Sequence, residues 1–571
     1  MPERAARVAH GLRVRRPRGK LERVSALPTS SAAAQGVDPA AVCALVEAWE
    51  GGGLRPFAMT LLRHGHVVVD AVWAPYAPDD QVQKYSVSKT FTAAATGLAV
   101  AEGRLSVDQA VASAWPQVTG LGPRASAMRV EHLLTMTTGH TSDTLARLDP
   151  DDLVASFLHT EPDADPGTVF TYDNAATAML SALVQQVTGE PLHDYLRPRL
   201  LDPLGVGDVR WLTVGPYDQG FSGLCTTNHA VARLGQTLLA RGEHAGTRVL
   251  SAEWVDAMMT VHTRLRGEQS ELARSADPIE GVDERSEDHT RLRGEQNELA
   301  RSADPIEGVD ERSEDHTRSR GEQNELARPA DTDGSVPDLG SDLGYGYGMW
   351  QARHGWRATG AFGQVCLVLP EQDLVLAVCA QDADVAPLLD AVWEHLLPGL
   401  GGEPDAATRP NPVALGLAAP DAAEARPDAL TAFFAGRALP TIASCAPPSP
   451  GRHQLRAVGP AAPAVATSGH VVVRDGTLVV EDSVGGVLVR LGDGRWERTP
   501  TTLPDDRTVD TAGTGGWTAP GVLDAHVVPL SSPHVLAVHA DIAAGTADLR
   551  WLAEPLGTLT LTGWHPGLAG W

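Results

Sequence analysis

The chain has 571 residues, 43% of them hydrophobic, and a formal net charge of −26 at pH 7. This length exceeds what one hydrophobic core supports, so it predicts a globular protein of two or more domains. The acidic balance argues against nucleic acid as a partner, because phosphate binding needs a basic surface. A membrane span is not expected either, since no apolar run reaches the required length of roughly 20 residues.

The cysteines are odd in number, scattered, and never spaced as C-x-x-C: Cys43, Cys225, Cys366, Cys379 and Cys445. This pattern predicts neither a disulfide framework nor a zinc site. A reduced, cytoplasmic protein without metal or cofactor is the expectation. Residues 1–24 include a basic stretch that no apolar segment follows, so we interpret them as a tail rather than a signal peptide.

The next elements in chain order alternate between strands and helices. Residues 58–73 predict two strands about a His64-Gly65 turn. Helices are expected over 90–103 and 174–189, each with a glycine at its end.

A tandem repeat of 27 residues is the strongest internal signal. It starts at His262, recurs at His289, and begins a partial third copy at His316. Each full copy carries four Arg against eight Asp and Glu, and it has few apolar residues. Such a segment buries too little surface to offset its ordering entropy, so disorder or a solvated helical patch is expected. A stacked solenoid is the less favoured alternative, since repeats stack through an apolar face. We interpret residues 262–333 as an insertion in a surface loop.

After the insertion, residues 346–351, 364–370 and 373–380 predict strands, and 385–397 predict a helix. Residues 25–397 therefore form one expected domain of strands and helices. A linker rich in Pro, Ala and Gly follows over 398–450. Residues 451–571 predict a small antiparallel β domain, with hairpins at 470–481 and 486–499 about Asp-Gly turns.

Lysine usage singles out one short motif. The chain has only three lysines, Lys20, Lys84 and Lys89, against 43 arginines. An ammonium can lose its proton in a suitable environment, whereas a guanidinium stays protonated. Ser86-Val87-Ser88-Lys89 places a hydroxyl and an amine on one helical face, which makes Ser86 a candidate nucleophile and Lys89 its base. The alternative is a serine at a helix N-terminus followed by a surface lysine.

Two further motifs accompany this pair. Tyr172-Asp173-Asn174 stands at the start of the expected helix 174–189, where Asp173 or Asn174 could simply cap the helix. A phenol there could share a proton with Lys89. Ala358-Thr359-Gly360 would let a substrate carbonyl approach the backbone of a strand, or it is an ordinary strand glycine.

These motifs, in this order and with these surroundings, resemble the serine β-lactamase and penicillin-binding-protein superfamily, in the branch that includes class C-related esterases, peptidases and nylon-oligomer hydrolases. The blocks that carry the resemblance lie within about residues 25–397, at 85–111, 130–140, 166–180, 200–206 and 358–378. The resemblance implies an α+β fold, with an antiparallel sheet flanked by helices and a helical subdomain, followed here by the C-terminal β domain.

The resemblance also implies roles for the site residues. Ser86 would be the acylated nucleophile, Lys89 its proton partner and Tyr172 the general acid/base. Asn174 would orient the substrate and Lys89. Thr359 and Gly360 would border the substrate, and the amides of Ser86 and Ala361 would form an oxyanion hole.

One departure bears on the substrate. Relatives usually begin the third motif with a cation that holds a substrate carboxylate, whereas this chain has Ala358. Neutral esters or amides are therefore expected to fit better, unless Arg353, His354 or Arg357 supplies the charge. A serine hydrolase with a small-molecule ester or amide substrate is the leading hypothesis.

The same motifs leave other functions open. A non-catalytic binding descendant of the fold and an acyltransferase that uses the same acyl-enzyme are the alternatives. An α/β-hydrolase is disfavoured because G-x-S-x-G is absent, and a metallohydrolase because H-E-x-x-H is absent.

Overall fold

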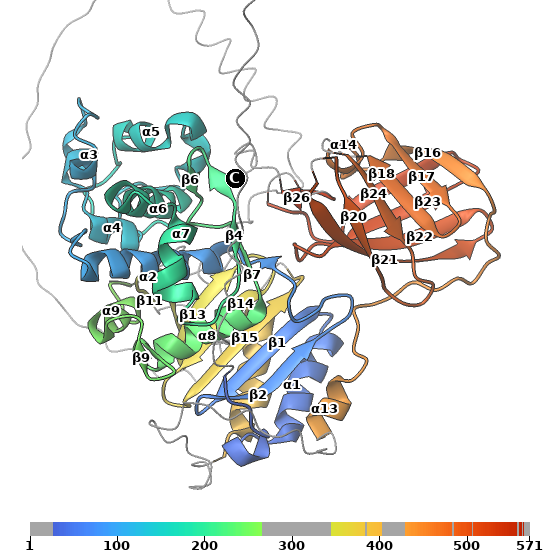
Figure 1. The fold of residues 1–571 in the computed structure, drawn as a ribbon, viewed down its shortest axis with the longest axis horizontal. Helices are drawn as coiled ribbons and strands as arrows, with labels where there is room; N and C mark the ends of the chain where they lie inside the picture. Colours follow the sequence, from blue (N-terminus) through green and yellow to red (C-terminus); the bar gives the residue numbers. More distant parts are fainter. Residues whose placement is uncertain are drawn as a thin grey trace, which may run out of the picture.

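The computed structural model describes residues 27–264, 344–382, 385–401, 429–481, 485–504, 506–556, 559–561 and 563–564. Figure 1 shows a mixed α/β body and, beside it, a separate group of C-terminal strands. The predicted tail at 1–24 and all but the first three residues of the predicted insertion at 262–333 lie outside the described residues. In the described ranges, no helix is both long enough and apolar enough to cross a membrane.

The first body is built around an eight-stranded sheet in which every neighbouring pair is antiparallel. Its order is β10 (Thr263–Arg264), β11 (Gly344–Tyr345), β12 (Trp350–Ala352), β13 (Gly355–Gly360), β14 (Gln364–Leu369), β15 (Leu374–Ala380), β1 (Pro56–Arg63) and β2 (His66–Val72). β10 and β11, which flank residues 265–343 in the sequence, are hydrogen-bonded neighbours at one edge of the sheet.

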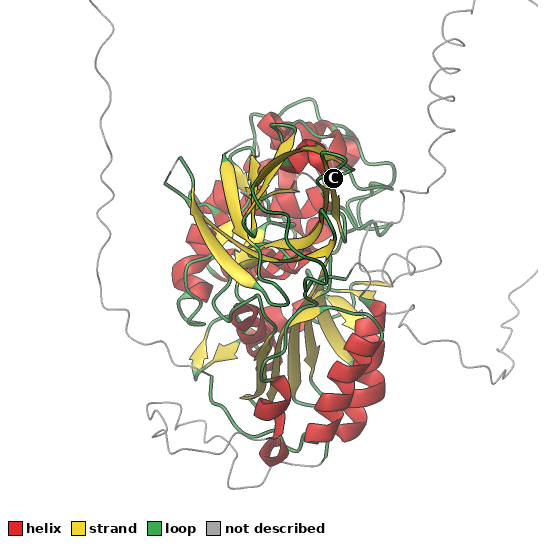
Figure 2. Ribbon diagram, turned by 90° about the vertical axis from the view of Figure 1, so that its right-hand side faces the viewer, coloured by secondary structure: helices red, strands yellow, loops and turns green. Residues whose placement is uncertain are grey.

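Both faces of this sheet are covered, and the strand sequences reflect it. Leu367 and Leu376 pack into the core under α1 (Pro39–Gly51) and α12 (Ala386–Ala391). Cys366 and Val375 belong to the opposite core, which α8 (Asn228–Leu239) covers. Strands buried on both sides are expected to be apolar without alternation. Figure 2 shows helices standing on both sides of the strands.

A mostly helical subdomain packs beside the sheet. It comprises α2 (Ser88–Ala101), α3 (Pro123–Ala127), α4 (Val130–Leu134), α5 (Leu153–His159), α6 (Asn174–Thr188), α7 (Leu192–Leu196) and α9 (Ala252–Met258). Asp173 caps α6 by accepting a hydrogen bond from the amide of Ala175, and Gly189 ends the helix in the left-handed conformation. A small sheet of β3 (Val82–Gln83), β7 (Leu224–Thr226) and β4 (Arg210–Trp211) lies at the entrance to α2. These elements confirm the predicted α+β architecture.

The strand predicted at 346–351 is wrong in part. Residues 346–349 form a turn between β11 and β12, because the glycines there approach other backbones closely. A Cβ on Gly346 would lie 2.1 Å from the carbonyl oxygen of Met258, and one on Gly348 would lie 2.8 Å from that of Lys89. Gly348 also has φ of 66°, a conformation that favours glycine.

The C-terminal strands form one nine-stranded sheet in the order β19-β18-β17-β16-β24-β23-β22-β21-β20. Their bounds are β16 (Arg452–Val458), β17 (His470–Arg474), β18 (Thr477–Glu481), β19 (Gly486–Arg490), β20 (Glu497–Thr502), β21 (Thr508–Ala519), β22 (Val522–Pro529), β23 (Leu536–Asp541) and β24 (Thr546–Trp551). All neighbours are antiparallel except β16 and β24. The predicted antiparallel β domain is thus confirmed.

The hairpin predicted at 486–499 does not form a ladder. β19 pairs with β18 and β20 pairs with β21, so the two strands lie at opposite ends of the sheet order. The amide of Arg490 nevertheless donates to Thr499 Oγ1 at 3.0 Å, and Gly492 bridges to Thr514, so the ends of the sheet curl toward each other. In the connection between the two strands, Trp496 Nε1 donates to the carbonyl of Leu439 at 3.0 Å.

The two bodies contact each other beside the start of α2. Tyr76 donates to the carbonyl of Ser532 at 2.7 Å, and the amide of Gln83 donates to that of Ser531 at 3.0 Å. Residues 429–450, from the predicted linker, include α13 (Ala429–Phe434), whose Phe434 ring packs on Trp73. The C-terminal strands are therefore attached next to the segment that carries the Ser-x-x-Lys motif.

Candidate active site

Ser86 lies on a single 3₁₀ turn, Tyr85–Val87, between β3 and the first residue of α2. Tyr85 has φ of 46°, a left-handed conformation that turns the chain sharply before the helix begins. The residues on both sides of Ser86 are buried, whereas Ser86 itself is partly exposed. The local fold therefore presents one hydroxyl at the N-terminus of a helix, where the helix dipole stabilises negative charge.

Lys89 is 2% exposed and points at Ser86. Its Nζ lies 3.0 Å from Ser86 Oγ, 2.7 Å from Asn174 Oδ1 and 3.0 Å from the carbonyl oxygen of Phe221. The contact with Ser86 follows from the spacing of three residues across the turn into α2, as expected from the sequence. Proton transfer between Lys89 and Ser86 needs no rearrangement, because the two atoms are already at hydrogen-bond distance.

Tyr172 borders the same amine. Lys89 Nζ lies 4.6 Å from the centroid of the Tyr172 ring. The ring is held by Trp350, at 5.2 Å between centroids, and by Tyr345, at 6.2 Å. Because Tyr345 belongs to β11, the strand on which the chain returns from the insertion packs directly against this tyrosine. The structure thus brings Ser86, Lys89, Tyr172 and Asn174 together.

Asn174 is oriented by a residue that sequence reasoning missed. Its Nδ2 donates to Asp143 Oδ2 at 2.7 Å, which fixes the amide so that Oδ1 faces Lys89. Asp143 lies on an irregular loop 31 residues upstream, and no motif in the sequence marks it. Burial, followed by the nearby Asp143 carboxylate, raises the pKa of Asp173 well above its usual range. Two acidic side chains therefore lie together at the start of α6.

Gly360 allows β13 to approach the Ser86 turn. A Cβ built on it would lie 2.3 Å from the carbonyl oxygen of Lys84 and 3.0 Å from the amide nitrogen of Ser86. Only glycine fits at this distance. Thr359 and Ala361, on either side, are 3% and 4% exposed. The third motif therefore lies directly against the turn that carries Ser86, with Gly360 facing the Ser86 amide.

A buried cation is present one residue before Ala358. Arg357 is 6% exposed, donates to Thr359 Oγ1 at 3.3 Å, and lies 5.9 Å from the Trp350 ring. Burial lowers the pKa of Arg357 to about 10, although its electrostatic interaction with Tyr172 acts to raise that pKa. Of the three charges considered from sequence, this one reaches the site. Arg353 is exposed, and His354 packs against Trp393.

The C-terminal β body also contacts the turn that carries Ser86. Tyr85 Oη lies 2.5 Å from His534 Nε2, and the other ring nitrogen of His534 lies 3.0 Å from the carbonyl oxygen of Ala553. This carbonyl can only accept, so Nδ1 carries the proton and Tyr85 donates to Nε2. Burial lowers the pKa of His534 to about 3, which keeps the ring neutral. Phe362, next to Ala361, packs 4.3 Å from the same ring.

The described residues contain no group of three or more His, Cys, Asp or Glu side chains that could hold a metal ion. Lys89 Nζ is hydrogen-bonded to the Ser86 hydroxyl, to the Asn174 side-chain amide and to the Phe221 main-chain carbonyl. Chemically, this arrangement can take a proton from a serine hydroxyl and return it to a leaving group.

The sequence pattern of the family described as Beta-lactamase matches residues 44–397, more than half of the chain. The chain therefore belongs to the beta-lactamase family, as the resemblance predicted. The match covers β1 to β15 and all the helices around the site, and it stops before the C-terminal strands.

Individual relatives align over shorter stretches. The 6-aminohexanoate-dimer hydrolase of Paenarthrobacter ureafaciens is 26% identical over 227 residues, 36% of this chain and 58% of that protein. Penicillin-binding protein 4 of Amycolatopsis lactamdurans is 31% identical over 161 residues, 27% of this chain and 41% of that protein. The aligned region thus spans less than two thirds of either relative. Among solved structures, the octameric penicillin-binding protein homologue from Pyrococcus abyssi has a TM-score of 0.39 at 15% identity, covering 90% of this chain and 98% of that one.

Proposed function

We propose that the protein is a serine hydrolase that cleaves an ester or amide through an acyl-enzyme on Ser86. The observation that carries the proposal is the distance of 3.0 Å between Lys89 Nζ and the partly exposed Ser86 Oγ. A serine hydroxyl is a weak nucleophile unless an adjacent base takes its proton, and Lys89 is placed to do this. Family membership supports the same chemistry.

In the proposed reaction, neutral Lys89 accepts the proton of Ser86 as Oγ attacks the substrate carbonyl carbon. The tetrahedral oxyanion is stabilised by the amides of Ser86 and Ala361, which Gly360 allows to lie close together. Tyr172, beside Lys89, passes the proton to the leaving alcohol or amine. Water then attacks the acyl-enzyme by the reverse proton path and releases the acid.

We propose that the acyl part of the substrate is a neutral small molecule. Ala358 provides no charge at the position where relatives hold a carboxylate. Arg357 already donates to Thr359 and lies beside the Trp350 ring, so we propose that it is held by these protein groups rather than by a substrate carboxylate. A short neutral ester should therefore be hydrolysed with a higher kcat/KM than a carboxylate-bearing β-lactam or a peptide with a free C-terminus.

The test is covalent labelling of the full chain with a fluorophosphonate probe, followed by mass mapping of the modified residue. We expect one adduct on Ser86 and none in Ser86→Ala. A well-folded wild-type protein that takes up no probe would contradict the proposal and would favour a binding protein. Product analysis with an added alcohol or amine then separates hydrolysis from acyl transfer, because both share the acyl-enzyme.

The cellular location is part of this proposal. All five cysteines are free thiols in the structure, including the exposed Cys445. Free thiols are typical of a reducing compartment, so we propose that the protein works in the cytoplasm.

Removing Asp143 should slow acylation with little effect on folding. Asp143→Ala deprives Asn174 of the acceptor that orients its amide toward Lys89. We expect labelling at saturating probe to slow by about tenfold, equivalent to about 1.4 kcal/mol, the size of one hydrogen bond. Asp143→Asn is the matched control, because its amide oxygen can still accept from Asn174. Equal rates for the two variants would show that the contact does not position Lys89.

Acid should weaken the structure through His534. The pKa of His534 is about 3 in the folded protein, against about 6.5 for an unfolded histidine. The unfolded chain therefore binds a proton that the folded chain excludes, and stability falls as pH decreases from about 6.5 toward 3, by up to about 1.4 kcal/mol per pH unit. His534→Gln keeps an acceptor for Tyr85 and removes the titration. Its Tm should fall less than that of the wild type between about pH 7 and 5, and parallel Tm curves would contradict this assignment.

A further inference from the structure

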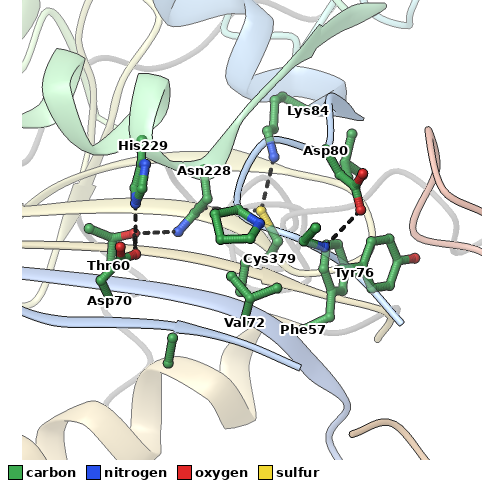
Figure 3. A pocket seen from close by; sticks show the side chains of 15 residues that line it. Phe57, Thr60, Asp70, Val72, Tyr76, Asp80, Lys84, Asn228, His229 and Cys379 are labelled. Carbon is green, nitrogen blue, oxygen red and sulfur yellow. Dashed lines mark hydrogen bonds and ion pairs between the residues drawn. The ribbon is translucent and has the colours of Figure 1, made fainter. Parts of the chain in front are cut away.

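Lys84 is a second buried amine that the proposed reaction does not use. It follows β3 directly, is 1% exposed, and its Nζ lies 3.0 Å from Cys379 Sγ on β15. Figure 3 shows the two side chains pointing toward each other. The chain has only three lysines, and the two that the structure describes are both buried. At position 84, as at position 89, an amine can act as a nucleophile or base where a guanidinium cannot.

The contact between the two groups is held in place by their neighbours. Cys379 Sγ also lies 3.3 Å from Asn228 Oδ1. The amide of Asn228 is fixed by donating from Nδ2 to Thr60 Oγ1 at 2.9 Å and to the carbonyl of Ala377 at 3.2 Å, so its oxygen must face the thiol. Figure 3 shows this chain of contacts from Lys84 to Thr60. The thiol therefore has one fixed neighbour on each side, an amide oxygen and an amine.

The pairing is unusual because it lacks a carboxylate. Among the described residues, no Asp or Glu oxygen lies within 4.0 Å of Lys84 Nζ, and its hydrogen-bond acceptor is the sulfur. A buried lysine is ordinarily paired with a carboxylate. Here the partner is a thiol, so a sulfur that oxidants attack and an amine that can attack an oxidised sulfur lie at one contact.

This contact lies at the wall of a narrow hollow. Lys84 and Cys379 line it together with Tyr76, Asp80 and His229, and about 20 Å³ of it is open to a molecule the size of water. Figure 3 looks into it. Residues of β1 and β2, at one end of the strand order, form part of the wall of this hollow. Ser86 is not among its lining residues. Hydrogen peroxide is only slightly larger than water, so it is the oxidant that suits a space of this size beside the sulfur.

We propose that Lys84 and Cys379 form an oxidation-dependent covalent bridge. The Cys379 thiol is first oxidised by hydrogen peroxide to the sulfenic acid, and the peroxide is reduced to water. The lone pair of neutral Lys84 Nζ then attacks the sulfur, the S–O bond breaks, and a second water leaves with a proton from nitrogen. The sum is thiol plus amine plus one peroxide, giving an S–N bond and two waters. Sulfenic acids condense with nitrogen in this way.

The bridge would act on the nucleophile turn. This consequence, unlike the bridge itself, rests on the proposed function. The carbonyl of Lys84 accepts from the amide of Val87 at 3.1 Å and lies against Gly360. Shortening a 3.0 Å contact to a bond pulls Lys84 toward β15 and moves the turn that carries Ser86. Oxidation should therefore lower the reactivity of Ser86, and thiol reductants should restore it.

The chemical test uses the full chain treated with hydrogen peroxide at neutral pH, digested without reductant and analysed by tandem mass spectrometry. We expect a cross-linked peptide pair joining Lys84 to Cys379, lighter than the sum of the two peptides by two hydrogen atoms and lost on addition of dithiothreitol. Lys84→Arg keeps the charge and removes the nucleophilic amine, so its Cys379 should proceed to sulfinic acid instead. Cys379 found only as thiol or sulfinic acid in the wild type would overturn the proposal.

The functional arm measures the rate of fluorophosphonate labelling at Ser86 before oxidation, after oxidation and after reduction. We expect at least a fivefold fall in the wild type that dithiothreitol reverses, and no reversible fall in Lys84→Arg or Cys379→Ser. A cross-link without a change in labelling would refute the regulatory consequence. Absence of labelling in the untreated wild type would instead refute the proposed function, and the bridge would still be judged by mass alone.

Discussion

Replacing Lys89 with arginine should slow labelling of Ser86 by about a thousandfold while the protein stays folded. General-base catalysis typically contributes about 10²–10⁴-fold, and the guanidinium cannot accept the proton of Ser86 because it does not deprotonate in proteins. Arginine keeps hydrogen-bond donors that can face Asn174 and Phe221, so the loss would report mainly on the missing proton acceptor. The measurement is the rate of probe attachment at saturating concentration, with Tm recorded in parallel.

Lys84→Arg is the matched control for this experiment. It makes the same change at the other buried lysine, whose Nζ is directed at Cys379 Sγ rather than at Ser86 Oγ. Under reducing conditions it should keep labelling within a few-fold of the wild type, although the larger side chain should lower the free energy of unfolding by about 1–3 kcal/mol. Wild-type labelling in Lys89→Arg would remove Lys89 from the role of base.

The core of the candidate site was predictable because its contacts are local or lie next to helix starts. Ser86 and Lys89 meet through helical spacing alone. Tyr172 and Asn174 flank the cap of α6, and the resemblance placed them beside Lys89. In each case a short motif carried the information, so the structure adds distances rather than new residues.

The supporting residues were not predictable, because long-range packing brings them to the site. Asp143 lies on a loop without a motif, and His534 comes from a separate body, 449 residues after Tyr85 in the chain. Arg357 and Thr359 are two residues apart on β13 and therefore share a face of that strand. The sequence does not give the packing that puts Arg357 beside Trp350, or the Asp143 loop beside α6.

The same distinction applies to the fold. Strands such as β14 and β15 were evident as apolar runs, because both faces of the main sheet are buried. The turn at 346–349 was not predicted, because its glycines are required by close packing against the backbones of α2 and α9. Those helices are distant in sequence, so the local pattern does not reveal the packing. The pairing of β19 and β20 was misjudged because an Asp-Gly turn signal predicts reversal of the chain, whereas closure of the curled sheet decides which strands become neighbours.

Adding one methyl group at Gly360 should disable the site as strongly as losing the base. A Cβ there would lie 2.3 Å from the Lys84 carbonyl oxygen, and a backbone atom cannot move aside as a flexible side chain can. β13 must therefore retreat from the nucleophile turn, which separates the amides of Ser86 and Ala361. Loss of one oxyanion donor typically costs about 10²–10³-fold in rate. We expect Gly360→Ala to slow labelling of Ser86 by that factor.

The control for Gly360→Ala is Gly207→Ala, since a Cβ at Gly207 meets no atom within 4 Å and its φ is not in the left-handed range. This variant should label at the wild-type rate. Because the clash at Gly360 is steric, Tm of Gly360→Ala should also fall, so the rate must be measured well below the unfolding transition. A folded Gly360→Ala protein that labels as fast as Gly207→Ala would show that the amide of residue 361 does not take part, and the oxyanion would then depend on the Ser86 amide and the dipole of α2 alone.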